Sequence, residues 1–228
     1  MKKLVIAIDG PAASGKSTTA KLVAEQLGYL HLDTGAMYRA VTLKVIEEGI
    51  PFHDAERIGR LAEKTSVGLR QDGGKTRVVL DGRDVTKEIR SPEVTRHVSL
   101  VSSYPAVRKV MVREQRALAE HGGVVLEGRD IGTVVLPDAD LKIYMVANVD
   151  ERARRRKREM EHAGVDVDEE ILKGEILERD RRDSTRESSP LRKAPDALEL
   201  DTSGLAIDEQ VHFIVERARH LMEKSKHQ

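Results

Sequence analysis

Apolar residues in this chain gather in four short continuous runs separated by longer amphipathic stretches. The runs are Leu4–Ile8, Val124–Leu126, Lys142–Ala147 and Ala197–Leu200. Such runs are typical of strands that are buried on both faces of a parallel sheet. Helical patterns fall between or after them, at Lys16–Leu27, Pro105–Ala119, Val149–Ala163 and Ile207–Lys224. Strands that alternate with helices predict a three-layer αβα fold of the α/β class, with a parallel central sheet.

The stretch from about Tyr38 to Leu100 interrupts this alternation. It contains helical patterns near Ala40–Glu48 and Ala55–Thr65, and a β-like pair, Val67–Arg70 and Arg77–Leu80. The turn residues Asp72-Gly73-Gly74 separate the two members of the pair, as in a hairpin. We therefore expect an α+β insertion here.

A second interruption, from Asp150 to about Arg192, is densely charged and has few large apolar residues. Its basic residues form two clusters, Arg152, Arg154, Arg155, Arg156, Lys157 and Arg158, and then Arg179, Arg181, Arg182 and Arg186. Interspersed acidic residues can pair with most of them at i,i+4 spacing, as on a solvated helix. The pattern predicts either a mobile flap or a solvated helical hairpin.

Composition narrows the classes of protein to consider. The 228 residues suffice for one α/β domain with insertions or for two small domains. Lys and Arg number 39, as do Asp and Glu, so bulk charge does not attract nucleic acid or an anionic membrane. The absence of cysteine excludes disulfides and thiolate chemistry. No apolar segment approaches the roughly 20 residues of a transmembrane helix. We expect a soluble, cytoplasmic protein.

Candidate chemistry begins at residues 10–18, GPAASGKST, between the first apolar run and the helical pattern that follows it. The spacing G-x-x-x-x-G-K-S is that of a P-loop, whose backbone N–H groups point at phosphate oxygens. Lys16 is predicted to reach the β- and γ-phosphates, and the Ser17 hydroxyl to hold Mg²⁺. The predicted nucleotide-binding residues are Gly10, Pro11, Ala12, Ala13, Ser14, Gly15, Lys16, Ser17 and Thr18.

A P-loop by itself does not distinguish kinases from other nucleotide-binding proteins. The strand Val124–Leu126 leads into Glu127-Gly128-Arg129-Asp130, and ligands of open α/β sheets bind beyond the carboxyl ends of the strands. Arg129 and Asp130 are therefore predicted to project into the site, with a strand-end ion pair as the alternative. Two to four arginines on a closable flap would neutralise the charge that develops during phosphoryl transfer.

Four segments resemble bacterial cytidylate kinases, in their order and spacing and over essentially the whole chain. They are GPAASGKST, LDTGAMYRA, EGRDIGTVV and ERDRRDSTR. The second and third are the more discriminating, because many families share the P-loop. The resemblance implies a P-loop nucleoside monophosphate kinase with a CORE domain at 1–37, 101–150 and 190–228. It also implies an NMP-binding insertion at 38–100 and a helical LID at 151–189.

The same resemblance implies ATP as phosphoryl donor, Mg²⁺, CMP or dCMP as acceptor, and a monomer. The implied acceptor contacts are Thr34, Arg108, Asp130 and Arg186 at the pyrimidine, Ser99, Arg179 and Asp183 at the pentose, and Arg39 and Arg129 at the phosphate. The implied catalytic residues are Lys16, Arg129, Arg154 and Arg158. Some relatives have Gly at the position of Ala13, and because alanine favours a negative φ, we expect a negative φ there.

The chemistry of the acceptor shapes the expected mechanism. A phosphate monoester has a second pKa of about 6 and is already an anion at neutral pH. We therefore expect neither a general base nor a covalent intermediate. Catalysis would rest on alignment of donor and acceptor and on charge neutralisation by Lys16, Mg²⁺ and arginines.

Three alternatives stay open at the level of sequence. One is a P-loop kinase for another small acceptor, such as a different monophosphate or a shikimate-like metabolite. Another is a GTPase-like switch, which needs a guanine-reading N-K-x-D motif; the nearest string, Ala147-Asn148-Val149-Asp150, lacks the lysine. The third is a nucleic-acid-binding module, against which zero net charge and few aromatic residues argue.

Overall fold

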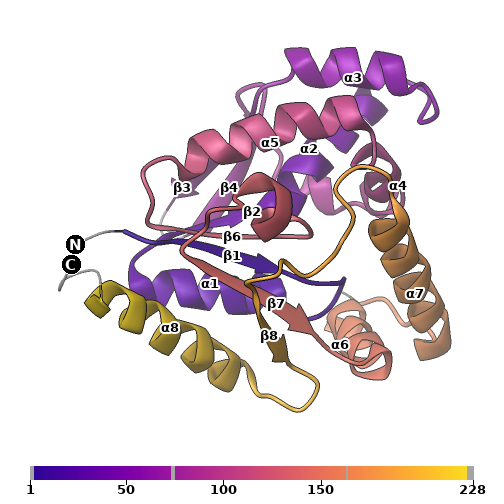
Figure 1. The fold of residues 1–228 in the computed structure, drawn as a ribbon. Helices are drawn as coiled ribbons and strands as arrows, with labels where there is room; N and C mark the ends of the chain where they lie inside the picture. Colours follow the sequence, from indigo (N-terminus) through magenta and orange to yellow (C-terminus); the bar gives the residue numbers. More distant parts are fainter. Residues whose placement is uncertain (1–2, 73–74, 163, 225–228) are drawn as a thin grey trace. The chain divides into compact units, whose positions relative to one another are not determined.

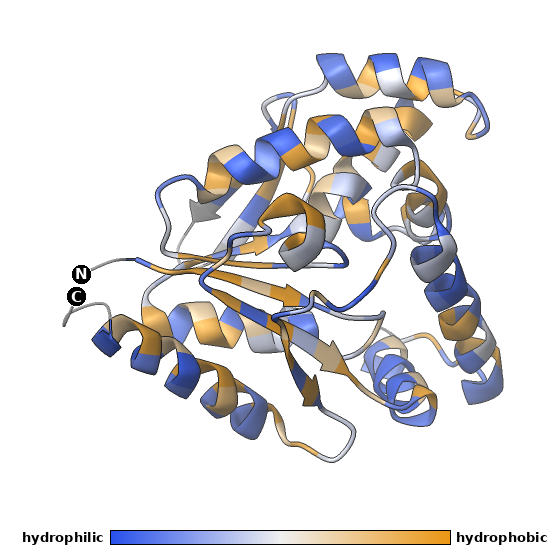
Figure 2. Cartoon of the chain, in the orientation of Figure 1, coloured by the Kyte–Doolittle hydropathy of each residue, from blue (hydrophilic) through white to orange (hydrophobic). Residues whose placement is uncertain are grey.

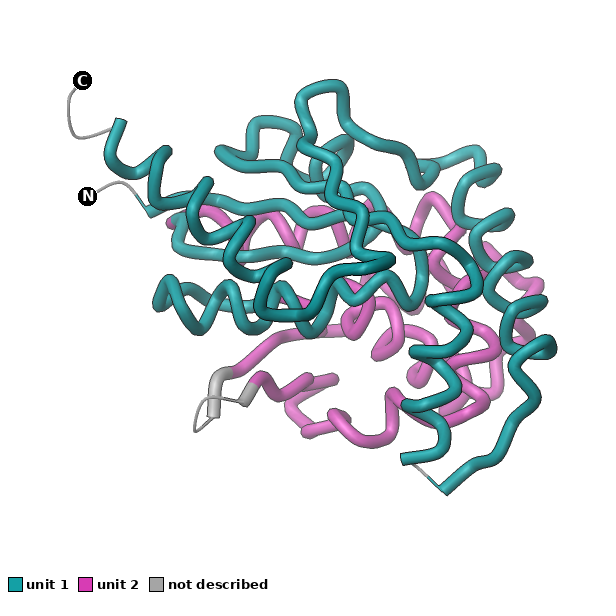
Figure 3. Tube along the Cα trace, turned by 90° about the horizontal axis from the view of Figure 1, so that it is seen from below, with its two compact units in different colours: residues 1–31, 122–228 teal, residues 32–121 magenta. Residues whose placement is uncertain are grey.

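The computed structural model describes residues 3–72, 75–162 and 164–224, and its chain forms two compact units. Unit 1 contains residues 1–31 and 122–228, and unit 2 contains residues 32–121 (Figure 3). Gly73, Gly74 and Ala163, which the sequence assigns to a turn and to the end of a helix, lie outside the described residues. No helix in the described ranges is long and apolar enough to cross a membrane.

A five-stranded sheet with the order β2-β6-β1-β7-β8 organises unit 1 (Figure 1). The strands are β1 (Val5–Asp9), β2 (Leu30–Asp33), β6 (Val124–Gly128), β7 (Leu141–Val146) and β8 (Leu198–Asp201). β1 pairs in parallel with both β6 and β7, and β7 pairs in parallel with β8. The four predicted strands and their parallel arrangement are confirmed, with ends shifted by one or two residues, but the edge strand β8 is largely exposed rather than buried on both faces. Only β2, whose first two residues belong to unit 1, has no counterpart among the predicted strands.

Two helices of unit 1 pack together beside this sheet, α1 (Lys16–Leu27) and α8 (Ile207–Lys224) (Figure 1). Both begin and end where the sequence predicts. α1 ends at Gly28, whose φ of 65° lies in the left-handed region that favours glycine. The core joins apolar residues of the central strands to the inner faces of α1 and α8 (Figure 2). Its most buried members include Ile6, Ile8, Val23, Val125, Ile143, Met145, Val211 and Ile214.

The charged stretch forms a helical hairpin of α6 (Val149–His162) and α7 (Glu169–Thr185), which contact each other. The predicted helical hairpin is confirmed. The Asp168 side chain caps α7 by accepting a hydrogen bond from the Glu170 N–H at 2.7 Å. Few apolar residues are buried in the pair, among them Ala153, Leu172 and Ile176, and α6 is predominantly hydrophilic (Figure 2). Burial of so few side chains gives this hairpin much less apolar stabilisation than the sheet receives.

Unit 2 is an α+β assembly around its own core of buried apolar residues. Its helices are α2 (Thr34–Glu47), α3 (Ala55–Lys64), the short 3₁₀ helix η1 (Glu88–Arg90), α4 (Pro92–Val101) and α5 (Pro105–Ala119). Its sheet has the order β3-β4-β5, with β3 (Val67–Asp72), β4 (Lys75–Leu80) and β5 (Arg83–Asp84). The predicted β-like pair is confirmed, because β3 and β4 run antiparallel.

Two helix starts in unit 2 differ from prediction. The helical pattern predicted near Ala40–Glu48 belongs to α2, which begins earlier, at Thr34, because the Asp33 carboxylate accepts a hydrogen bond from the Ala36 N–H at 3.0 Å and caps the helix. Helix α4 was not predicted, although Ser91 as N-cap and Pro92 at the first helical position are the usual start signals.

Unit 2, at residues 32–121, extends beyond the predicted insertion at 38–100, because α5 packs against α3 and α2 within this unit. The division into CORE, NMP-binding and LID segments stays a prediction about function.

Candidate active site

The P-loop connects β1 to α1 and curls through backbone conformations that glycine tolerates best. Gly10 has a φ of 153°, and a Cβ atom added there would lie 2.2 Å from the Met145 carbonyl oxygen, so only glycine fits. Ala13 has a φ of 58°, and the expected negative φ at this position is wrong. The curl of the loop requires a left-handed residue there, which costs an alanine about 1–2 kcal/mol.

Lys16 is the first residue of α1, and its side chain is almost fully buried. Its Nζ donates a hydrogen bond to the Pro11 carbonyl oxygen at 2.7 Å, across the mouth of the loop. Burial, together with the positive charge of Arg129, lowers the pKa of Lys16 to about 7. The negative charge of a bound phosphate group would offset the unfavourable energy of placing these two positive charges together away from water. The site is therefore electrostatically prepared for an anion.

Ser17, the next residue, takes part in a series of side-chain hydrogen bonds centred on Glu127, which lies near the carboxyl end of β6. Ser17 Oγ donates to Glu127 Oε2 at 2.7 Å, and His31 Nε2 lies 3.1 Å from Glu127 Oε1. Glu127 is buried. Burial raises the pKa of Glu127, but the His31 hydrogen bond and the positive charge of Lys16 outweigh burial and leave the pKa below its usual value. An ionised carboxylate therefore stands beside the hydroxyl that the sequence assigns to Mg²⁺.

Asp9, the last residue of β1, fixes the loop that follows β6. Its Oδ1 accepts a hydrogen bond from the Ile131 N–H at 2.8 Å, and its Oδ2 accepts one from the Gly132 N–H at 2.7 Å. These amides come directly after Asp130, at the start of a short π-helix, η2 (Ile131–Val135). Burial raises the pKa of Asp9 to about 6, although both amide hydrogen bonds act to lower it.

The predicted acceptor residues of unit 1 form ion pairs with one another. Arg129 Nε donates to Asp183 Oδ2 at 2.9 Å, and Arg186 Nη2 lies 3.4 Å from Asp130 Oδ1. Burial raises the pKa of Asp183, but the charges of Arg129 and Arg179 outweigh it and lower that pKa overall. Arg179 lies within electrostatic reach of Lys16 as well. The structure therefore brings these five residues into one cluster of partly or fully buried charges.

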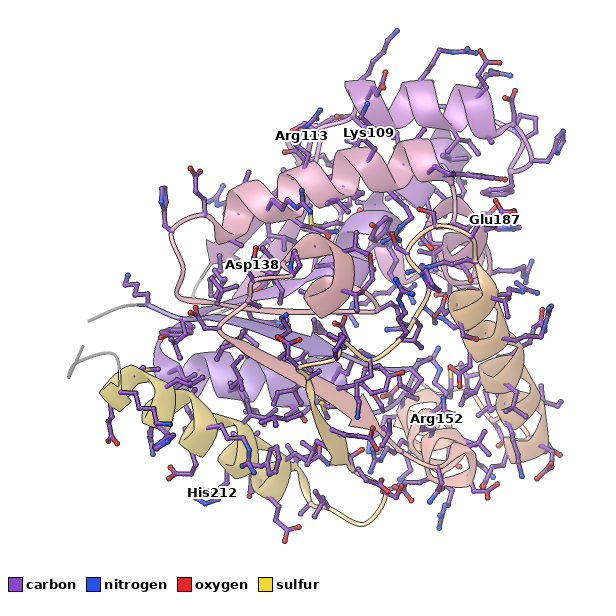
Figure 4. All side chains as sticks on the ribbon, in the orientation of Figure 1. Lys109, Arg113, Asp138, Arg152, Glu187 and His212 are labelled. Carbon is purple, nitrogen blue, oxygen red and sulfur yellow. The ribbon has the colours of Figure 1, made fainter. Side chains whose placement is uncertain are left out.

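Arginines of α6 divide into two groups. Arg154 and Arg158, predicted to act on the donor phosphates, are exposed and pair with Glu151 at 3.2 and 3.5 Å. Arg152 and Arg155 instead face the P-loop. Each donates to a loop carbonyl at 3.3 Å, Arg152 to that of Ala12 and Arg155 to that of Ser14. Figure 4 labels Arg152 on α6. Contact with the P-loop thus comes from arginines that the sequence could not separate from their neighbours.

The predicted acceptor residues of unit 2 lie on α2, α4 and α5. Thr34 is buried at the start of α2. Arg39 Nη1 donates to Thr95 Oγ1 at 2.9 Å, and Arg108 stacks over the Tyr38 ring at 5.3 Å. Ser99 Oγ is buried and has no hydrogen-bond partner among the described residues. A buried hydroxyl without a partner costs free energy, so Ser99 fits a group that a ligand satisfies.

Comparison with known proteins decides the family. The sequence profile of a family described as cytidylate kinase matches residues 6–220 of this chain. The chain belongs to the cytidylate kinase family. It is therefore a nucleoside monophosphate kinase, a phosphotransferase whose substrates are small nucleotides, and membership in a kinase family implies ATP as the phosphoryl donor.

Relatives named cytidylate kinase resemble the chain over most of its length. The protein of Pelotomaculum thermopropionicum is 54% identical over 213 residues, covering 93% of this chain and 94% of the relative. That of Streptococcus gordonii is 50% identical over 225 residues, covering 98% and 100%. Among solved structures, a gluconokinase from Sinorhizobium meliloti is similar at a TM-score of 0.49 and 15% identity, covering 99% of this chain and 97% of that one. The fold class follows from the parallel sheet and the P-loop described above.

Besides Arg152 and Arg155, three residues of this cytidylate kinase family member were missing from the predicted site. Asp9 and Glu127 each end an apolar strand run, and an acidic residue at the carboxyl end of a buried strand was a usable signal. His31 gave no such signal, because β2 was not predicted and its partner Glu127 lies 96 positions away in the chain.

Proposed function

We propose that this protein transfers the γ-phosphoryl group of ATP to CMP or dCMP and forms ADP with CDP or dCDP. Membership in the cytidylate kinase family supports the reaction. The observation that carries it in the structure is the convergence of Lys16, Ser17 and the Glu127 carboxylate at the end of β1 and β6. Such a site can hold a polyphosphate and neutralise its charge.

The donor site consists of the P-loop residues Gly10 to Thr18, with Lys16 directed at the β- and γ-phosphates. We propose that Mg²⁺ binds beside Ser17. The Ser17 hydroxyl and the Glu127 carboxylate, 2.7 Å apart, are oxygen donors of the kind that Mg²⁺ prefers. When bound, the ion would neutralise phosphate charge. No general base is needed, because the acceptor phosphate is already an anion.

The acceptor residues follow the family pattern. Thr34, Arg108, Asp130 and Arg186 would contact the base, Ser99, Arg179 and Asp183 the pentose, and Arg39 and Arg129 the phosphate. The unpartnered hydroxyl of Ser99 supports its place in this set. The pairs Arg129–Asp183 and Arg186–Asp130 support theirs, because these charged groups are already held in a buried cluster.

Choice of base has a physical basis in this proposal. Cytosine carries an N4 amino donor where uracil carries a carbonyl acceptor, so a carboxylate such as Asp130 accepts from the first and repels the second. An unpaired buried polar group costs about 1–3 kcal/mol, or roughly ten- to a hundredfold in selectivity. Asp130 would therefore favour CMP over UMP.

Closure of the LID, residues 151–189, over bound nucleotides would keep water from accepting the phosphoryl group. Arg154 and Arg158 are proposed to reach the donor phosphates upon closure, and Arg152 and Arg155 already contact the P-loop. CORE, at 1–37, 101–150 and 190–228, would carry the donor site, and 38–100 the NMP-binding segment. The protein is further proposed to act as a cytoplasmic monomer.

A coupled ADP-release assay tests this function, with MgATP and CMP, dCMP, UMP, AMP or shikimate as separate acceptors. We expect release to be fastest with CMP and dCMP, and ATP hydrolysis without acceptor to be weak. Faster release with AMP or shikimate would favour a kinase for another acceptor. Rapid acceptor-independent hydrolysis would contradict the proposed exclusion of water.

A further inference from the structure

We propose that His31 is a positioning residue that orients the Glu127 carboxylate toward Ser17 and its metal ion. This inference rests on the proposed function and adds to it a residue outside the P-loop and outside the predicted site. His31 lies on the edge strand β2, next to β6 in the sheet. Its side chain is largely buried, at 13% exposure, and its Nε2 lies 3.1 Å from Glu127 Oε1.

The direction of this hydrogen bond follows from the chemistry of its acceptor. A carboxylate oxygen without a proton can only accept a hydrogen bond, so the contact between His31 Nε2 and Glu127 Oε1, at 3.1 Å, takes its hydrogen from the imidazole. His31 Nε2 therefore carries the hydrogen atom and donates a hydrogen bond to Glu127 Oε1. With Oε1 bound by His31, Oε2 is the oxygen that faces the Ser17 hydroxyl, at 2.7 Å. The two hydrogen bonds together select one orientation of the carboxylate.

Strand docking does not need the His31 side chain. The edge position of β2 is held through its backbone, where the Leu30 N–H donates to the Gly123 carbonyl oxygen at 2.8 Å. Along β2 the side chain of Leu32 points to the opposite face from that of His31 and is fully buried. Loss of the imidazole donor therefore leaves both the backbone pairing and the buried leucine of this strand in place.

Groups that hydrogen-bond to metal ligands typically change metal affinity or activity by about 10–100-fold when removed. Replacement of His31 by a residue without a donor frees the Glu127 carboxylate to rotate toward the charged Lys16. The expected consequence is weaker metal binding at Ser17, with little change at the acceptor site.

The test compares His31→Leu, which keeps much of the volume and removes the donor, with His31→Gln, whose side-chain amide can donate at a similar reach. His212→Ala is the matched control, because His212 is exposed on α8 (Figure 4). The first readout is Mn²⁺ binding to each protein in the presence of ADP, followed by electron paramagnetic resonance of the free ion. Melting temperatures without metal check that each variant is folded.

We expect His31→Leu to weaken Mn²⁺ binding about tenfold, and His31→Gln and His212→Ala to bind like the wild type. In kinetic assays the Mg²⁺ concentration for half-maximal rate should rise in the same proportion in His31→Leu, with the KM for CMP changed by less than about twofold. Unchanged Mn²⁺ binding in His31→Leu would overturn the inference. Equal losses in His31→Leu and His31→Gln would do so too, because a donor would then be irrelevant.

A double-mutant cycle with Glu127→Ala tests whether His31 acts through Glu127. If it does, His31→Leu adds no further loss of Mn²⁺ affinity in the Glu127→Ala background, whereas additive losses would assign His31 another role. The wild type in the same kinetic assay separates the two proposals. Absence of CMP-dependent ADP release there would refute the proposed function, while normal release with unaffected His31 variants would refute only the inference about His31.

Discussion

Unit 1 contains two regions rich in charged residues, the carboxyl ends of β1 and β6 and the outer surface of the hairpin of α6 and α7, and they differ in how deeply the charges are buried. At the carboxyl ends of β1 and β6, Asp9, Lys16 and Glu127 are each at most 6% exposed, and hydrogen bonds fix each of them. On the hairpin of α6 and α7, pairs such as Arg181 with Glu178 lie in solvent and join residues of the same helix turn. Burial rather than charge density therefore distinguishes the site from the hairpin surface.

The physical reason is the cost of removing a charge from water. At the carboxyl ends of β1 and β6 that cost lowers the pKa of Lys16 and raises that of Asp9. A bound ligand of opposite charge can offset part of the cost. An exposed pair gains and loses little, since water and salt screen it. Substitutions in the first region should therefore alter chemistry, and substitutions of hairpin residues outside the proposed site, such as Arg181, should not.

The largest expected effect comes from Lys16→Met. Loss of this buried charge removes a donor aimed at the phosphates, and we expect kcat with CMP to fall about 10²–10³-fold. The matched control is Arg181→Ala on the hairpin, with kcat expected within about twofold of the wild type. Steady-state ADP release with saturating MgATP and CMP measures both. Equal effects of the two substitutions would refute the contrast between the regions.

A pH-dependent effect should follow from Asp9. Its pKa is raised from 3.8 to about 6 in the folded protein, so the folded state binds the proton more tightly than the unfolded state. This contribution to stability is present below pH 3.8 and is lost as the pH rises through about 6. The difference in unfolding free energy between wild type and Asp9→Asn should therefore fall by about 3 kcal/mol across that range.

Urea unfolding of both proteins from pH 4 to 7 measures this difference. Asp150→Asn on α6 is the control with the opposite sign. The pKa of exposed Asp150 is lowered by its hydrogen bond with Lys173, so its small contribution appears as the pH rises. A pH-independent difference for Asp9→Asn would show that burial does not govern this carboxylate.

The smallest expected effect is a change of specificity. Asp130→Ala should reduce the ratio of kcat/KM for CMP over UMP by roughly ten- to a hundredfold, because the carboxylate that accepts from the cytosine amino group is lost. Asp138→Ala, an exposed residue on the loop before β7 (Figure 4), should leave the ratio unchanged. Competition between the two acceptors in one assay gives the ratio directly. A preserved ratio in Asp130→Ala would refute the role of this residue.

Local sequence patterns were enough to predict most strands and helices of unit 1 and the position of the P-loop. Short, mainly apolar runs identified four parallel strands, of which β1, β6 and β7 are largely buried, as expected for strands covered on both faces. β8, at the edge of the sheet, is mostly exposed. Helices α1, α5 and α8 were predicted to the residue. Gly28 marks the end of α1, and Pro105 marks the start of α5. The P-loop could be identified from the sequence because the spacing of its glycines sets a local backbone conformation. The four family motifs likewise lie within continuous segments.

Other features required the tertiary structure. The left-handed Ala13 runs against the preference of its own residue type, because the loop around it dictates φ. Arg152 and Arg155 could not be told from Arg154 and Arg158, since only the way α6 packs decides which arginines meet the P-loop. The link between Ser17, Glu127 and His31 joins three distant positions of the chain. Strand order sets that proximity, and strand order depends on long-range pairing that no local pattern encodes.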